Sequence, residues 1–331
     1  MSNPERLNML IAITRVMGEA MKEKQIFRHI LVPVDGSPSS LSAQELAVLI
    51  AKKFNSKVTA LHIVTHELMH PELARFHPET REYITGGSPR TYQGEPWVHV
   101  PEPPVSQVVM EVTNLYRQRG EDVVNDAVIL FKEEGISADR KLIEHADPAE
   151  AIVREAQKEN CDLIVMARSA GEEESKPHLG SIAGKVSVHA QMPVLIAAEG
   201  KQISKILVPI DGSKASKKAA KYGGILAKKT QAAMALLYVQ ESSLFRVRPE
   251  LTKKIGTDIL SSFAKSVKEV KADQRLEPGD PAKVISQTAD REGYDLIVMG
   301  AKGHSGIRRL LLGSVSDHVI HYTNHAVLLV K

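Results

Sequence analysis

The 331-residue chain is long enough for about two domains, and its 43% apolar and 25% charged residues exclude a disordered or fibrous protein. The net charge of +3 conceals a basic half, with 21 Lys and Arg against 12 Asp and Glu from Ser204 onward. These lysines fall mainly on predicted helix faces, and no row of aromatic residues accompanies them for stacking on bases, so nucleic acid is not favoured as a partner. No run of about 18 apolar residues predicts a membrane span, the first residues do not resemble a signal peptide, and the single cysteine, Cys161, excludes an intrachain disulfide, so we expect a cytoplasmic protein.

Residues 1–25 place apolar side chains at helical spacing, including Leu7, Leu10 and Met17. This spacing predicts an N-terminal helix with one apolar face. The opposite face has no basic cluster, so we expect the helix to pack against a domain or a subunit rather than a membrane.

An internal repeat organises the rest of the chain. ILVPVDGS at 30–37 recurs as ILVPIDGS at 206–213, an offset of 176, and DLIVM at 162–166 recurs at 295–299, an offset of 133. Several blocks in the same order indicate two tandem copies of one domain, 26–199 and 203–331. The change of offset predicts about 43 additional residues in the first copy.

Each copy alternates short apolar strands with amphipathic helices. The expected elements of the first copy are 29–35, 40–54, 57–64, 147–159, 161–167 and 193–198, and those of the second are 205–211, 217–229, 233–239, 280–292, 294–300 and 326–331. Near-continuous apolar strands separated by helices predict a parallel sheet covered on both faces. The fold class is therefore α/β, with two tandem doubly wound, Rossmann-like domains.

An insert at about 65–107 interrupts the first copy after its second predicted strand. It begins with His66-Glu67-Leu68-Met69-His70, which matches the HExxH pattern of zinc proteases. Pro71 follows at once, and the stretch leaves a strand instead of lying within a long helix. We therefore expect no catalytic metal. A non-catalytic site using His66 and His70, with His77 as a candidate third ligand, stays open as a minor alternative, and scattered polar histidines on a loop are favoured over it.

A glycine-rich loop follows the fourth strand of the second copy. Gly300 and Gly303 are separated by two residues, and nine more precede Gly313-Ser314, where Val315 continues a predicted helix. Glycine allows backbone amides to approach an anion, and a helix N-terminus adds unpaired N–H groups and a favourable dipole. The loop is neither a dinucleotide GxGxxG nor a P-loop, and its features together predict a triphosphate site.

The combination of PxDGS, GxxG and GS resembles the universal stress protein family in its tandem form, over about residues 26–199 and 203–331. The resemblance implies that Gly300, Gly303, Gly313, Ser314 and Val315 surround the ribose and phosphates of ATP. It also implies that the first strand's end borders the nucleoside, that the second strand's end meets the adenine, and that the fourth strand's end adjoins the loop. Pro209, Ile210 and Asp211 end the first strand, Val239 ends the second, and Met299 ends the fourth. Paired closing strands in that family further imply an intramolecular pseudo-dimer of the two copies.

The first copy departs from this pattern. Ala167 and Ala170 replace the two loop glycines, although Gly180 and Ser181 remain. Glu172, Glu173 and Glu174 lie between them and would repel phosphates. We expect little or no ATP binding by the first copy.

The leading hypothesis is a cytoplasmic ATP-binding regulatory protein of the stress response, with Mg²⁺ shared between phosphates and water and with an unidentified protein partner. A slow ATPase or phosphotransfer enzyme is one alternative, with Asp211 and His304 as candidate bases. A ligand-free scaffold is another. Homo-oligomers are compatible with the sequence.

Overall fold

The structure is a computed structural model. It describes residues 26–65, 105–144, 146–168, 179–198, 200, 202–241, 248–267, 270–302 and 312–331, except the side chains of 105–110. Outside the described residues lie the predictions for the helix of residues 1–25, the metal ligands His66, His70 and His77, the loop residues Gly303 and His304, and Ala170 with Glu172–Glu174. In the described part, no helix is both long and apolar enough to cross a membrane.

The two copies build one ten-stranded sheet with the order β3-β2-β1-β4-β5-β10-β9-β6-β7-β8. The first copy contributes β1 (His29–Pro33), β2 (Lys57–Val64), β3 (Ala138–Glu144), β4 (Leu163–Met166) and β5 (Val194–Ile196). The second contributes β6 (Lys205–Pro209), β7 (Ala233–Glu241), β8 (Ala272–Gly279), β9 (Leu296–Gly300) and β10 (Ala326–Val330). Strands are parallel within each copy, which confirms the prediction of two doubly wound domains.

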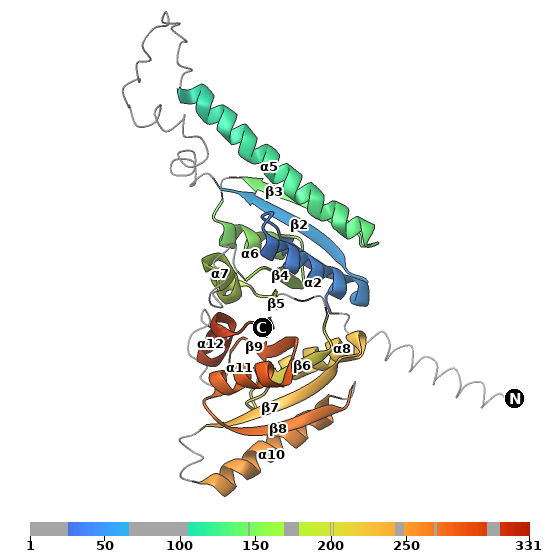
Figure 1. Cartoon of the computed structure of the whole chain (residues 1–331), viewed down its shortest axis with the longest axis vertical. Helices are drawn as coiled ribbons and strands as arrows, with labels where there is room; N and C mark the ends of the chain where they lie inside the picture. Colours follow the sequence, from blue (N-terminus) through green and yellow to red (C-terminus); the bar gives the residue numbers. More distant parts are fainter. Residues whose placement is uncertain are drawn as a thin grey trace, which may run out of the picture.

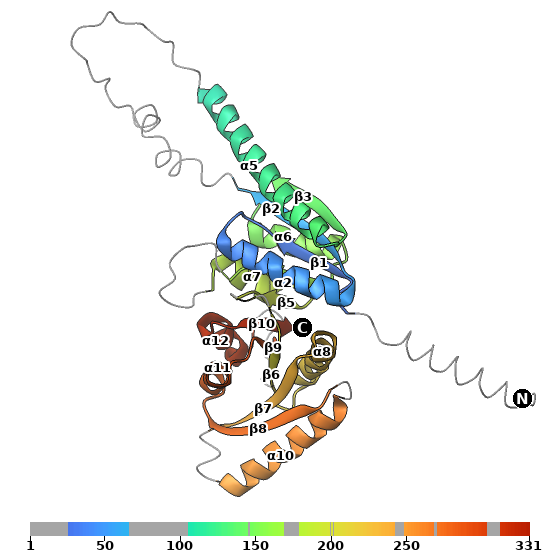
Figure 2. The same cartoon turned by 45° about the vertical axis from the view of Figure 1, so that its right-hand side comes forward.

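The closing strands join the copies. β5 and β10 pair antiparallel, with Leu195 opposite Leu328, and both strands are buried. Figure 2 shows this junction between the two halves of the molecule. Each closing strand would otherwise present an unpaired apolar edge, so the pairing removes an aggregation-prone surface. The predicted intramolecular pseudo-dimer is confirmed.

Helices cover both faces of the sheet (Figure 1). One face carries α2 (Pro38–Phe54), α5 (Val105–Glu133), α8 (Lys214–Thr230) and α10 (Pro249–Ser266), whose apolar residues share one core cluster. The other face carries α6 (Pro148–Lys158), α7 (Ser181–His189), α11 (Pro281–Glu292) and α12 (Ser314–Tyr322), which share a second cluster. Both clusters contain residues of both copies, so the chain has two cores separated by the sheet rather than by the repeat.

Local signals set the helix starts. The side chains of Asp147 and Asp280 accept hydrogen bonds from the third residue beyond them, and a proline follows each at the first helical position. Ser37 and Ser213 cap α2 and α8 in the same way. Such caps satisfy amides that a helix cannot pair, and losing one typically costs about 0.5–2 kcal/mol.

Candidate functional site

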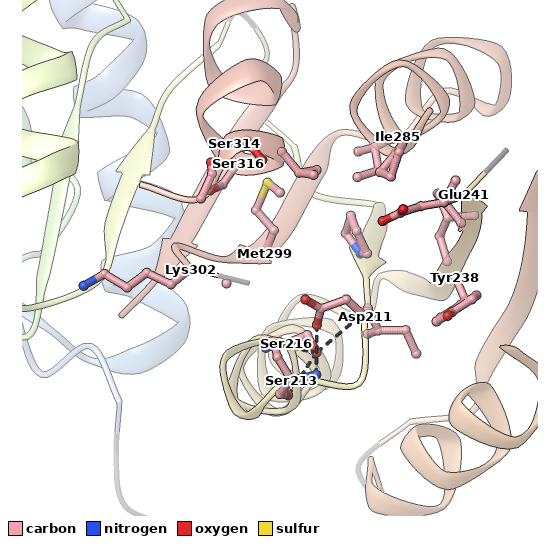
Figure 3. Close-up of a pocket in the computed structure, with 18 of the residues that line it drawn as sticks. Asp211, Ser213, Ser216, Tyr238, Glu241, Ile285, Met299, Lys302, Ser314 and Ser316 are labelled. Carbon is pink, nitrogen blue, oxygen red and sulfur yellow. Dashed lines mark hydrogen bonds between the residues drawn. The ribbon is translucent and has the colours of Figure 1, made fainter. Parts of the chain in front are cut away.

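A cleft of about 460 Å³ lies in the second copy at the carboxyl ends of β6, β7 and β9. β6 separates β7 from β9, so the cleft lies where the strand order reverses, the usual ligand position in an open α/β sheet. Of the ten predicted site residues, nine line it: Pro209, Ile210, Asp211, Val239, Met299, Gly300, Gly313, Ser314 and Val315. The tenth, Gly303, is outside the described residues. Figure 3 shows labelled side chains around the cleft from these strand ends and from α8, α11 and α12, with Lys302 pointing away from the others.

The Asp211-Gly212-Ser213 segment forms a tight turn between β6 and α8. Asp211 Oδ1 accepts a hydrogen bond from the Ser213 N–H at 2.9 Å, and Gly212 has a φ of +88° that favours glycine. Ser213 Oγ then accepts from the Ser216 N–H at 3.1 Å, which caps α8. The turn therefore fixes a carboxylate and two hydroxyl groups at the wall of the cleft.

Gly300 ends β9 against the first turn of α8. A methyl group added there would lie 2.8 Å from Ala215 Cβ, 3.0 Å from the Ala215 carbonyl carbon and 3.2 Å from Ser216 N. Neither Gly300 nor Gly313 has a positive φ, so neither position requires the left-handed backbone conformation that glycine permits. At Gly300 the missing Cβ instead permits close backbone packing beside the cleft.

The N-terminus of α12 supplies hydrogen-bond donors to the opposite wall. Gly313 is the N-cap residue, and its N–H donates to Ala301 O at 2.9 Å. The helical ladder begins with Asp317 N donating to Gly313 O at 2.8 Å, so the N–H groups of Ser314, Val315 and Ser316 precede that ladder. Together with the helix dipole, they make this wall suitable for an anion.

Apolar side chains form the floor of the cleft. Ile210 and Met299 are each 5% exposed, while Val239 and Ile285 enter from β7 and α11. A flat apolar group such as a nucleobase can bury its faces on such a floor. The cleft thus combines an apolar floor with one hydroxyl-rich wall and one wall of helix amides.

Other lining residues were not anticipated from the sequence. Tyr238, Gln240 and Glu241 flank Val239 at the end of β7, and their position beside a predicted strand end was the available signal. Gln240 Nε2 donates to Thr252 Oγ1 at 3.3 Å, which brings the first turn of α10 to the cleft. Burial raises the pKa of the Tyr238 phenol, with Glu241 and Asp211 adding to the effect, so this phenol is neutral near pH 7.

The first copy repeats the turn of the second. Asp35 Oδ1 accepts from the Ser37 N–H at 2.9 Å, and Gly36 has a φ of +80°. Gly180 N donates to Arg168 O at 2.8 Å, which matches the Gly313–Ala301 contact. Unlike its counterpart, this copy places the Ala167 methyl where the second copy has Gly300. The framework of the site is therefore present twice, with different side chains at the loop.

The comparisons with known proteins agree with this architecture. A model of the universal stress protein family matches residues 26–85, 97–198 and 202–331. A universal stress protein of Methanocaldococcus jannaschii is 38% identical over 138 residues, which cover 38% of this chain and 81% of that protein. The stress response protein NhaX of Bacillus subtilis is 29% identical over 171 residues, or 51% of this chain and 96% of that protein.

Solved structures show the same fold over almost the whole chain. A universal stress protein from Archaeoglobus fulgidus superimposes with a TM-score of 0.57 at 20% identity, covering 92% of this chain and 98% of the other. At this identity the likeness concerns the fold alone. Because the family model covers most of the chain, in both halves of the repeat, the chain belongs to the universal stress protein family and carries its domain in tandem.

Proposed function

We propose that this chain is a nucleotide-binding regulatory protein that holds ATP in the cleft of the second copy. The observation that carries the proposal is the convergence of three recognition elements at one strand-order reversal: the Asp211 turn, the apolar floor and the N-terminus of α12. Each matches a different part of a nucleoside triphosphate. The match between this cleft and the residues expected from the sequence supports the same ligand.

In the proposed complex, the phosphates lie against Gly313, Ser314 and Val315, where backbone amides replace water. The adenine lies against Val239 on the apolar floor, and Asp211 borders the nucleoside. No group of three His, Cys, Asp or Glu side chains that could hold a metal ion occurs among the described residues. In this proposal Mg²⁺ arrives on the phosphates and keeps water as its other ligands, because the α12 wall of the cleft offers backbone amides.

We propose a regulatory role in the cytoplasm, in which bound nucleotide changes the contacts made with a protein partner. The first copy does not bind ATP with comparable affinity in this proposal, because Ala167 and Ala170 replace the two loop glycines and Glu172, Glu173 and Glu174 would repel phosphates. Its part is structural, since it pairs β5 with β10 and completes both cores.

A matched pair of variants tests the assignment. Ser314→Asp places a carboxylate at the first turn of α12, and Ser181→Asp places it at the equivalent turn of α7. An acid at a helix N-terminus favours the helix itself, so both variants should fold. Beside a triphosphate it is repulsive, so Ser314→Asp should weaken Mg-ATP binding at least about tenfold, whereas Ser181→Asp should not.

Calorimetric titration of the full chain provides the readout. Equal affinities for the two variants would refute the site, and absence of heat with the wild type would refute the ligand. cAMP serves as the competing probe, because it is the ligand of one solved universal stress protein, matched over 39% of this chain with a TM-score of 0.33. Release of ADP from the bound complex would favour an enzyme over a regulatory binder.

A further inference from the structure

Arg168 belongs to the first copy but binds the second. It is the second residue after β4 and corresponds to Ala301 in the repeat. Its Nη1 donates to Ile320 O and its Nη2 to His325 O, the latter at 3.0 Å. Both acceptors lie at the carboxyl end of α12 or just beyond it, so a guanidinium of one copy holds the end of a helix in the other.

The chemistry of this contact is favourable to α12. The last carbonyl groups of a helix have no helical partner, and a cation there also satisfies the helix dipole. Arg168 is partly buried, and loss of water lowers its pKa to about 10, which still leaves it charged near pH 7. A desolvated guanidinium is costly unless it is hydrogen-bonded, so these two carbonyl groups and Arg168 stabilise one another.

The held helix, α12, is one of the helices that line the cleft. α12 has nine residues, which makes it about 14 Å long, and its first turn lines the cleft with Gly313, Ser314 and Val315. His325 also pairs with Asp290 of α11 at 2.7 Å, and α11 lines the cleft at its other end with Pro281 and Ile285. Arg168 therefore contacts the junction of two helices whose N-terminal turns both reach the cleft.

A second cation makes the reverse contact. Lys331 of the second copy donates from Nζ to Ser187 O near the end of α7 in the first copy. Lys331 corresponds to Ala198 in the repeat, just as Arg168 corresponds to Ala301. The two donors therefore occupy different positions of the repeat, whereas the acceptors Ser187 O and Ile320 O are equivalent. Only Arg168 holds a helix that lines the candidate nucleotide cleft.

We infer that Arg168 is a positioning residue for nucleotide binding, through which the first copy fixes the phosphate-facing helix of the second. The inference rests on the proposed function for its ligand. It assigns the first copy a part in the site that does not require the first copy to bind nucleotide. A change at the end of β4 would then alter the affinity of a cleft in the other half of the molecule.

The test compares three variants of the full chain. Arg168→Gln removes the charge, Arg168→Lys keeps a cation at the helix end, and Lys331→Gln removes the reverse contact as a matched control. Hydrogen exchange reports on the amides of α12 without nucleotide, and calorimetry reports the Mg-ATP dissociation constant. We expect Arg168→Gln to speed α12 exchange about tenfold and raise the dissociation constant about five- to tenfold. Arg168→Lys should keep the α12 exchange rate and the Mg-ATP dissociation constant close to those of the wild type. Lys331→Gln should change the exchange rate of α7 alone.

Each outcome bears on the inference. If the wild type binds ATP and Arg168→Gln binds equally well, Arg168 has no positioning role. If Arg168→Gln and Lys331→Gln weaken ATP binding alike, the effect is a general loosening of the junction and the inference is wrong. If the wild type itself binds no ATP, the proposed function fails; α12 exchange then decides alone whether Arg168 fixes the helix, and unchanged exchange overturns the inference.

Discussion

Substituting Gly300 by alanine separates the packing role of this glycine from any contact with a ligand. Its new Cβ would lie 2.8 Å from Ala215 Cβ and 3.0 Å from the Ala215 carbonyl carbon, whereas ordinary van der Waals contacts lie between 3.4 and 4 Å. To relieve this overlap, the first turn of α8 must move away from β9 by several tenths of an ångström. Because part of the clash is with backbone, no side-chain rotation removes it.

Such overpacking typically costs about 1–3 kcal/mol of folding free energy. For a domain of 150–250 residues this lowers the melting temperature by roughly 2–12 °C. We expect the protein to remain folded, because Ala167 occupies the equivalent position of the first copy. Ser213 and Ser216, which line the cleft, belong to the displaced segment. Its movement should therefore lower the affinity for Mg-ATP as well.

Gly184→Ala is the matched control. Its added methyl would meet only Leu179 Cδ2 at 3.7 Å, and the residue lies inside α7, where alanine is the better helix former. Thermal unfolding of both variants, followed by calorimetry with Mg-ATP, measures the two effects. A Gly300→Ala protein as stable as the wild type would refute the packing argument. Unchanged stability combined with weaker ATP binding would instead assign Gly300 to the ligand.

Three further predictions follow from single residues. Burial, with the charge of Lys302, lowers the pKa of Lys331 from 10.5 to about 8, so between these pH values Lys331 binds a proton more tightly in the unfolded chain than in the folded one. The unfolding free energy of the wild type should therefore rise relative to that of Lys331→Gln as the pH increases from 8 to 10. Urea-unfolding free energies that stay parallel for the two proteins over this range would contradict this. Burial also raises the pKa of the Cys161 thiol to about 12, so a thiol reagent at pH 8 should modify the unfolded protein and leave the folded one unmodified over the same time. Asp280→Ala removes the cap that accepts the Lys283 N–H at 3.0 Å, so it should cost about 0.5–2 kcal/mol in urea unfolding, and Asp280→Ser should recover most of that loss.

The central strands and the capped helices were predictable because their signals are local. β1, β4, β6 and β9 are almost wholly buried, so each reads as an apolar run, and the repeat identifies the pairs independently. β3 and β8 were not predicted. They are the two outer strands of the sheet, and their sequences, ADRKLIE and ADQRLEPG, contain several charged residues and lack the apolar run of a central strand. Their charges suit a sheet edge.

The helices beside these edge strands, α5 and α10, were also missed. Each covers only the margin of the sheet and is less apolar on average than α2, and Leu115 on one and Leu251 on the other are exposed. The contribution of Thr252 to the cleft depends on α10 and could not be seen without it. Arg168 and its acceptor Ile320 in α12 are 152 residues apart in the sequence. Their contact depends on how the two copies pair, which no local sequence pattern indicates.

The positions of the loop residues were predictable, but the reason for one of them was not. The spacing of Gly300 and Gly313 indicated an anion site, and the structure places both in the cleft. The close approach of Ala215 to Gly300 is a contact between α8 and β9, and residues 231–295 lie between these two elements in the sequence. A sequence pattern identifies such a glycine without distinguishing a backbone contact from a ligand contact.

The number of ATP molecules bound per chain tests the central claim most directly. Titration of the full chain with Mg-ATP, followed to saturation, should give one site, because the loop of the second copy keeps Gly300 while that of the first carries Ala167 and the acidic run Glu172–Glu174. Two equal sites would contradict the proposed division between the copies. No binding at all would contradict the assignment of a nucleotide to the cleft between Asp211 and the N-terminus of α12.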